Sequence, residues 1–206
     1  MKKSLILSSL ALSALLVSAC SSTGTLTRYY TLAADSSIRA SKSYPYKLVV
    51  QKFTIDPAYN SSNIIYRESP YDFMSYNHDL WATAPDHQIV NVFTDDLKQS
   101  GLFEKVEQHA SEMPDYEITG HLLAIEEIDE GSNRFARVAI EISFRDVKKD
   151  STLWKNSFDA KESLNGTEPR EIAKSASKLV NRYAQTVISE VENILSRTSM
   201  PESAVQ

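Results

Sequence analysis

Residues 137–145 read RVAIEISFR, and this stretch shows the clearest alternation of apolar and polar side chains in the chain. Successive side chains of a β-strand point to opposite faces of a sheet, so the alternation predicts a strand with one buried face and one wet face. The apolar face would carry Val138, Ile140, Ile142 and Phe144. The stretch therefore predicts a sheet that packs on a core through one face only.

Two similar segments lie on either side of this strand. Residues 116–124 alternate in the same way, and residues 154–160 continue the pattern with aromatic and small side chains. Turn-like residues at 129–133 and 148–151 separate the three segments. Because short turns join antiparallel neighbours, residues 115–161 are expected to form an antiparallel meander.

Two other segments follow the helical period. Residues 85–100 place an apolar side chain at every fourth position, and Gly101 stands where a helix would stop. Residues 169–195 carry a longer apolar stripe, with Thr167 as the expected N-cap, and so regular a stripe usually faces a core. We predict an α+β fold: a single domain in which two amphipathic helices pack on one face of a mainly antiparallel sheet.

Shorter strands are expected in the N-terminal half of the chain. Residues 28–32 and 46–53 are rich in β-branched and aromatic side chains, and residues 64–67 and 71–74 indicate a hairpin. Trp81 follows this hairpin in a polar connection, where a large aromatic ring either docks on the core or serves as a binding anchor. General burial preferences favour docking on the core.

The composition argues against several kinds of function. The 206-residue chain has 22 Lys+Arg against 27 Asp+Glu, a net charge of −5, and no basic cluster interleaved with aromatic residues, so no nucleic-acid partner is expected. Only five glycines occur, without a phosphate-binding loop, and the four histidines lack metal-ligand spacing. No nucleophile with a matching base is visible. We therefore expect a protein that is not an enzyme and that holds no metal.

One charged run stands out after the first strand of the meander. It consists of Glu126, Glu127, Asp129 and Glu130. Charge runs at turns are usually solvated, so we interpret this run as a solvated hairpin turn rather than as a site for a cation or a basic partner.

The N-terminus has the pattern of a secretory signal. Lys2 and Lys3 precede an apolar run that ends in small residues just before Cys20, the single cysteine of the chain. The run is too short to span a bilayer, which needs about 20 apolar residues. We predict a signal peptide over residues 1–19; the alternative is an ordinary signal that happens to end near a buried cysteine.

The end of this leader, VSAC at residues 17–20, resembles the lipobox of bacterial lipoproteins. The resemblance implies that the sulfur of Cys20 receives a diacylglycerol and its amino group an acyl chain. Apart from this covalent lipid, no cofactor is expected. Each buried CH₂ contributes about 0.8 kcal/mol, so such a residue anchors the chain firmly. Ser21 stands where inner-membrane lipoproteins often carry aspartate, which implies an outer-membrane anchor and a periplasmic location.

This interpretation divides the chain into four parts. Residues 1–19 are the signal peptide, and residues 20–28 are the lipidated cysteine with a short tether. Residues 29–195 form the folded domain, and residues 196–206 are expected to be a disordered tail.

Short apolar sequence motifs in the domain resemble those of the ABC-type transport auxiliary lipoproteins, the PqiC-like group. The resemblance covers about residues 29–195. The motifs and single residues that carry it are YYTL at 29–32, LVV at 48–50, Pro57, IIYR at 64–67, Tyr76, Trp81 and Pro85 at the start of a helix.

The resemblance implies a non-catalytic auxiliary role in the traffic of lipids or hydrophobic solutes between the inner and outer membranes. Such lipoproteins work with MCE-domain proteins, which form periplasmic conduits, and with inner-membrane transport components that are often ABC permeases and ATPases. A homo-oligomeric ring would match the symmetry of a multimeric conduit. The residues expected near the partner-facing surface are Tyr66, Arg67, Tyr71 and Trp81.

Two other functions stay open on the sequence. An outer-membrane assembly or envelope-scaffold lipoprotein would share the tether, the compartment and the absence of catalytic residues. A lipid-modifying hydrolase would need a nucleophile, a base and an oxyanion site, and the sequence shows none of these in a recognisable pattern.

Overall fold

The computed structural model of the chain describes residues 26–35 and 37–198. The predictions for the signal peptide, for Cys20 and for residues 199–206 lie outside the described residues. Among the described residues, no helix combines the length and the apolar character needed to cross a bilayer.

Three long strands form the meander that the alternating pattern predicts. They are β7 (Tyr116–Glu130), β8 (Asn133–Asp146) and β9 (Ser151–Ser163), and both pairings are antiparallel. In this register Ile142 lies between Gly120 and Asn156. A Cβ atom on Gly120 would come within 2.6 Å of the Phe53 ring, so only glycine allows this ring to pack against β7.

The other edge of β7 pairs with short strands in parallel. From one end of β7 to the other, these are β2 (Tyr44–Val50), β3 (Thr54–Ile55) and β4 (Asn63–Arg67). The sheet is therefore mostly but not purely antiparallel. Side-chain periodicity predicts where a strand lies, but it carries no information about the direction of its neighbour.

Three more strands complete the sheet, and a short 3-10 helix lies among its connections. β6 (Phe103–Glu107) pairs in parallel with β2, and η1 (Pro57–Tyr59) follows β3. β5 (Met74–Trp81) pairs antiparallel with β4, and β1 (Arg28–Tyr30) pairs in parallel with β5. β5 begins at the end of the predicted second hairpin strand and runs through Trp81, so the segment interpreted as a polar connection is a strand.

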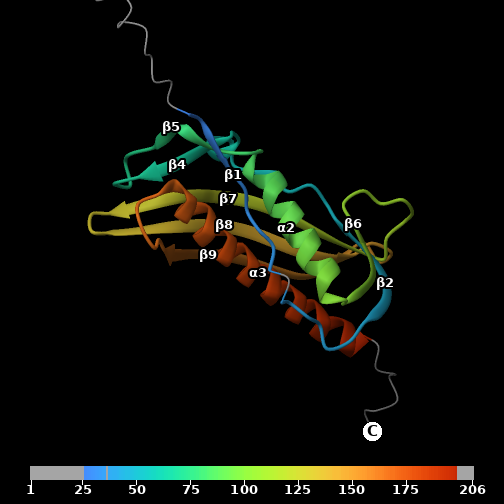
Figure 1. Cartoon of the computed structure of the whole chain (residues 1–206). Helices are drawn as coiled ribbons and strands as arrows, with labels where there is room; N and C mark the ends of the chain where they lie inside the picture. The colour runs from blue at the N-terminus through green and yellow to red at the C-terminus, as the bar shows by residue number, and fades with distance from the viewer. Residues whose placement is uncertain (1–25, 36, 199–206) are drawn as a thin grey trace, which may run out of the picture.

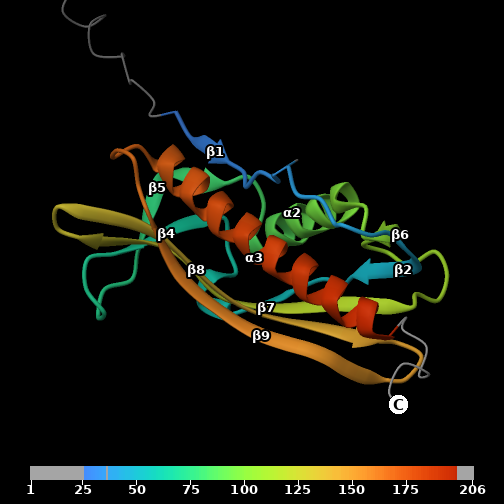
Figure 2. The ribbon, with the colours of Figure 1, turned by 90° about the horizontal axis from the view of Figure 1, so that it is seen from below.

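Both helices lie on the concave face of the curled sheet (Figure 1, Figure 2). α2 (Pro85–Ser100) has the predicted bounds, and Gly101 ends it in the left-handed conformation at φ 71°. α3 (Pro169–Thr198) begins as predicted but runs three residues past the expected end. Residues 196–198 are thus helical rather than part of a disordered tail. The α+β prediction with two helices on one face is confirmed.

The core lies between the helices and the concave face of β7 and β8. The apolar stripe of α3 is buried, as are Ile142 and Phe144 on the predicted apolar face of β8. Leu97 of α2 is also buried in this cluster. The stripe of α3 is therefore core, as its regular spacing indicated.

The segment after β1 runs between α2 and α3 before it enters β2 (Figure 1). We call residues 31–43 the strap; residue 36 within it is not described. The Leu32 amide donates to Gln88 of α2 at 2.7 Å. The Asp35 amide donates both to Asp96 of α2 at 3.0 Å and to Asn181 of α3 at 2.8 Å. The strap therefore links the N-terminal end of the domain to both helices.

Candidate functional site

Two turns meet at one end of the sheet, the turn between β4 and β5 and the turn between β7 and β8 (Figure 1). We call this region, residues 66–76 and 126–137 together with Tyr59, the hairpin end. Two consecutive glutamates of β7 are buried beneath these turns, and both are only 1% exposed. Two buried carboxylates need compensating partners, so the hairpin end is the region where polar chemistry is concentrated.

Glu126 is held by two arginines and a tyrosine. Its Oε2 atom accepts from the Tyr59 hydroxyl at 2.5 Å and from Arg67 Nε at 2.6 Å. Its Oε1 atom accepts from Arg137 at 2.7 Å, and the same guanidinium donates two bonds to Asp159 at 2.8 and 2.7 Å. The two arginine charges balance the two carboxylate charges of this network.

Glu127 has a second network made of the same residue types. The Tyr76 hydroxyl donates to Glu127 Oε2 at 2.7 Å, and Arg134 pairs with Oε1 of the same carboxylate. Arg134 also donates to the Tyr76 oxygen at 2.9 Å. The Tyr76 ring lies 5.1 Å from the Tyr66 ring, measured between centroids. Because β7 side chains alternate, the two networks lie on opposite faces of the strand.

The interpretation of residues 126–130 as a solvated turn is wrong for Glu126 and Glu127. β7 continues to Glu130, and the turn lies at Gly131, which has φ 76°. Antiparallel pairing places Arg137 of β8 directly opposite Glu126. One of the cations that compensate this buried carboxylate is therefore supplied by the neighbouring strand.

The networks shift the pKa values of their tyrosines and of Arg67. Burial, and secondly the hydrogen bond to Glu126, raises the pKa of Tyr59 to about 12. Burial, and secondly the hydrogen bond to Glu127, also raises the pKa of Tyr76. The hydrogen bond with Tyr59 and the pairing with Glu126 raise the pKa of Arg67, although burial opposes this. Both tyrosines thus stay neutral donors at neutral pH. The arrangement holds a surface in place, because the tyrosines and Arg67 keep the buried carboxylates hydrogen-bonded.

Among the described residues, no group of histidine, cysteine, aspartate and glutamate side chains is placed to hold a metal ion. A hollow of about 440 Å³ lies beside the first network. Its walls include Arg67, Pro70, Glu126 and Lys161. The buried carboxylate at this hollow already accepts three hydrogen bonds from side chains.

A comparison with protein families identifies the chain. Residues 30–188 match the model of the ABC-type transport auxiliary lipoprotein component. The chain belongs to this family. The match includes the sheet from the end of β1 onward, all of α2, α3 as far as Ile188, and the hairpin end. No curated protein sequence matches the chain.

Solved structures share the fold of this chain. A crystal structure of a Xanthomonas campestris protein of the family DUF330 has a TM-score of 0.72 at 14% identity, covering 84% of this chain and 99% of that one. A second, uncharacterised protein has a TM-score of 0.67 at 14% identity, with 81% and 99% covered. A hypothetical protein from Chlamydia trachomatis has a TM-score of 0.51 at 11% identity, with 74% and 99% covered. At these identities the likeness concerns the fold alone.

In this member of the family, three of the four expected partner-binding residues lie at the hairpin end, with Tyr66 beside the Glu127 network and Arg67 in the Glu126 network. Tyr66 and Arg67 are half-buried, and Tyr71 at the turn is 95% exposed. Phe73 adds a ring that is 44% exposed and that packs under the Arg67 guanidinium at 4.7 Å. The Arg67 side chain thus connects the buried carboxylate below with the exposed aromatic turn above.

Trp81 does not belong to this surface. It lies at the other end of β5, seven residues beyond Met74, and only 1% of it is exposed. Its backbone amide donates to the Ser62 carbonyl at 2.7 Å, which ties this end of β5 to the segment before β4. The expectation that it contacts a partner is corrected here, because a ring buried in the core offers no area to a partner.

Sequence reasoning missed the residues beneath the surface. Tyr59, Arg134 and Arg137 were not singled out as functional candidates, and Glu126 and Glu127 were interpreted as a solvated turn rather than as a site. The sequence did contain a signal for these residues. Arg137 follows the expected turn at about the distance at which Glu126 precedes it. Mirrored opposite charges on a hairpin predict a cross-strand ion pair.

Proposed function

We propose that this chain is a non-catalytic auxiliary lipoprotein of an MCE- and ABC-type system for intermembrane transport of lipids or hydrophobic solutes. In this proposal Cys20 carries the lipid anchor, the outer membrane holds it, and the domain faces the periplasm. The partners are an MCE-domain conduit protein and inner-membrane transport components. Family membership supports the auxiliary role, and the finer assignments rest on the resemblance of the sequence.

The observation that carries the proposal is the exposed aromatic turn on a braced hairpin. Tyr71 offers nearly its whole ring to solvent, and an exposed aromatic ring on a rigid support is typical of a binding anchor. The support is rigid because Arg67 donates to Glu126 below and to the Asp72 carbonyl at 3.1 Å within the turn. We propose that this turn contacts the conduit protein, with Tyr66 and Arg67 orienting it.

A ring of several copies would present several such turns at once. Closed rotational symmetry lets identical surfaces contact a symmetric conduit. The weak contact of each turn would then be multiplied, because the later binding events become intramolecular.

The test is co-purification of the MCE-domain conduit protein with the lipoprotein from crosslinked envelopes. Tyr71→Ala is expected to lower the recovered conduit protein about tenfold, the size of effect typical of a central aromatic anchor. The matched control is Met113→Ala, since Met113 is also a large exposed apolar side chain, at 75%, but lies outside the hairpin end. Equal recovery for wild type and Tyr71→Ala would overturn the assignment of the surface.

A further inference from the structure

Four basic side chains recur at every fourth residue of α3. They are Arg170, Lys174, Lys178 and Arg182. Residues four apart lie on the same helix face, so the four cations form a line about 18 Å long. All four are exposed, and the side chains of Lys174, Lys178 and Arg182 are 58%, 54% and 56% accessible. We call this line the basic stripe.

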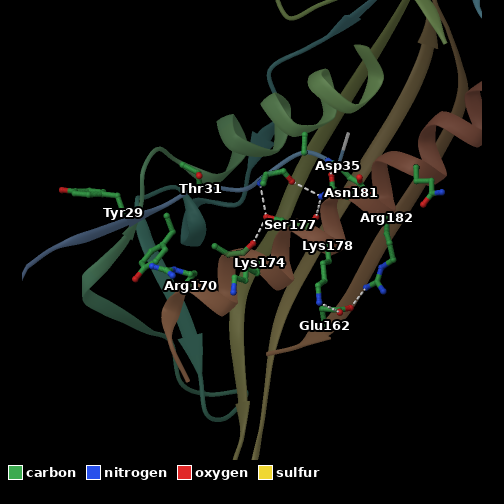
Figure 3. Close-up of a pocket in the computed structure, with 15 residues that line it drawn as sticks. Tyr29, Thr31, Asp35, Glu162, Arg170, Lys174, Ser177, Lys178, Asn181 and Arg182 are labelled. Carbon is green, nitrogen blue, oxygen red and sulfur yellow. Dashed lines mark hydrogen bonds and ion pairs between the residues drawn. The ribbon is translucent and has the colours of Figure 1, made fainter. Parts of the chain in front are cut away.

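The basic stripe borders an open trough of about 920 Å³ on the outer surface of α3 (Figure 3). One wall is the segment Tyr29–Asp35, formed by the end of β1 and the strap, and Glu162 of β9 stands at the other side. The floor is fixed, because Ser177 accepts from the Ala33 amide at 3.1 Å and Asn181 donates to the Ala33 carbonyl at 2.9 Å. The strap and α3 are therefore fixed to each other along the trough.

Positive charge dominates this trough although the whole chain is acidic. Four basic side chains line it against two acidic ones, Asp35 and Glu162, while the chain carries a net charge of −5. Glu162 pairs with Arg182 at 2.9 Å and more loosely with Lys178 at 3.5 Å. Outside the lining, Glu171 pairs with Lys174 at 2.6 Å. The cations of all these pairs are exposed, so the pairs are weak and can exchange for other anions.

The trough also lies beside the point where the chain enters the domain. β1 begins at Arg28, eight residues after Cys20, and an extended chain of eight residues spans at most about 29 Å. Tyr29, which is 64% exposed, lines the trough and points away from α3 (Figure 3), and Leu26 nearby in the sequence is 83% exposed. Exposed aromatic and apolar side chains next to basic ones are typical of surfaces that lie at a membrane interface.

We propose that the trough and its basic stripe bind the anionic headgroups of the phospholipids around the anchor, so that the outer face of α3 lies against the membrane surface. The proposal rests on the lipid anchor of the proposed function, because the short tether keeps this face within reach of the bilayer. Each basic side chain near an anionic membrane strengthens binding about fivefold. An open, linear row of cations fits a surface of many headgroups better than an enclosed site for one ligand.

The test uses residues 20–206 with Cys20→Ser, since every described helix and strand lies within residues 26–198. Binding is measured by flotation with vesicles of phosphatidylglycerol and phosphatidylcholine, and with vesicles of phosphatidylcholine alone. We expect binding to the anionic vesicles only, weakening as salt shortens the screening length from about 10 Å to about 3 Å. Replacing all four stripe residues by glutamine is expected to lower the partition coefficient at least tenfold.

A charge-matched control removes four exposed lysines elsewhere. Its substitutions are Lys52→Gln, Lys98→Gln, Lys148→Gln and Lys149→Gln. This control is expected to stay within about threefold of wild type. Glu162→Gln is expected to tighten binding severalfold, because it frees Lys178 and Arg182 from their pairing. This gain of binding decides the question even if the quadruple stripe variant fails to fold.

Three results would overturn the proposal: equal binding to both kinds of vesicle, an equal loss in the control, or unchanged binding of Glu162→Gln. If the stripe variant bound vesicles normally but no longer co-purified with the conduit protein, the trough would instead contact an acidic protein. Tyr71→Ala should leave vesicle binding unchanged, so a failure of the partner assignment and a failure of this proposal are distinguishable.

Discussion

The two ends of the long hairpin formed by β7 and β8 are built from the same two strands but held together differently. At the end where β7 begins, Tyr116 stacks on Phe144 at 5.0 Å between ring centroids, and Phe103 lies 6.4 Å from Phe144. At the hairpin end, Glu126 and Glu127 are equally buried but depend on arginine and tyrosine partners. One end is an aromatic core, and the other is a pair of ionic networks.

The two ends of the hairpin differ in which substitutions they tolerate. Apolar packing is non-directional, and its cost on substitution scales with the volume that is lost. A buried ion pair contributes little net stability, but removing one partner leaves an uncompensated charge. The aromatic end therefore supplies stability, whereas the hairpin end fixes the geometry of its exposed turn. That division agrees with the proposed placement of the partner surface.

The largest effect is expected from Phe144→Ala at the aromatic end. Phe144 is fully buried and contacts two rings, so its truncation should lower the free energy of unfolding by about 4 kcal/mol. Urea unfolding measures the change. Because the lost contribution is apolar, it should be nearly the same at low and high salt, and a strong dependence on salt would remove the distinction between the two ends.

A somewhat smaller effect is expected from Arg134→Met at the hairpin end. This change leaves Glu127 buried with the Tyr76 hydroxyl as its remaining side-chain partner among the described residues, so the free energy of unfolding should fall by about 3 kcal/mol. Adding Glu127→Gln should recover most of this loss, because the uncompensated charge is then gone. A double variant that is as unstable as the single one would show that Arg134 acts through packing instead.

Asp96 of α2 is another buried carboxylate, and it differs from Glu126 and Glu127 in its partners. Its Oδ2 atom has no hydrogen-bond partner among the described residues. Burial, aided by the nearby Asp35 and Asp95 carboxylates, raises the pKa of Asp96 to about 7, although the Asp35 amide opposes the shift. A raised folded-state pKa means that the folded protein keeps a proton which the unfolded chain has already lost. The stabilising contribution of this group is thus full below about pH 4 and declines until about pH 7.

The effect of Asp96→Asn should therefore depend on pH. Between pH 5 and pH 7.5, the stability of the variant relative to wild type should rise by about 2 kcal/mol, as followed by thermal unfolding at each pH. The matched control is Glu104→Gln at an exposed position of β6, outside the charges that act on Asp96, and it should show no such trend. A flat difference for Asp96→Asn would mean that the buried carboxyl is ionised throughout this range.

Local signals in the sequence were sufficient for the helices and the meander. α2 has the predicted bounds, because its period of apolar residues and the left-handed Gly101 act within the helix itself. The strand at residues 137–145 was equally clear, since one face meets the core along its whole length. Membership of the transport auxiliary family was also readable from short apolar motifs, and the family match over residues 30–188 confirms it.

Part of the candidate site could be predicted in the same way. Tyr66, Arg67 and Tyr71 were expected near one surface from the family resemblance, and in the structure they lie at or beside the turn between β4 and β5. Docking of Trp81 on the core, the favoured interpretation, is confirmed, whereas its placement near the partner surface was wrong. Its polar neighbours indicated a loop, but the segment is part of β5. Pairing of β5 with β4 and β1, rather than any local preference, makes that segment a strand. The strand directs the Trp81 ring toward the core.

The sequence by itself thus determined the α+β class, the two helices and the acidic balance of the chain. Only the tertiary structure decided that Glu126 and Glu127 are buried and paired. The reason is physical: periodicity reports which face of an element is apolar, whereas the state of a carboxylate depends on which cations lie within a few ångströms. For Glu126 one of those cations is Arg67, 59 residues away along the chain, and folding alone brings them to 2.6 Å.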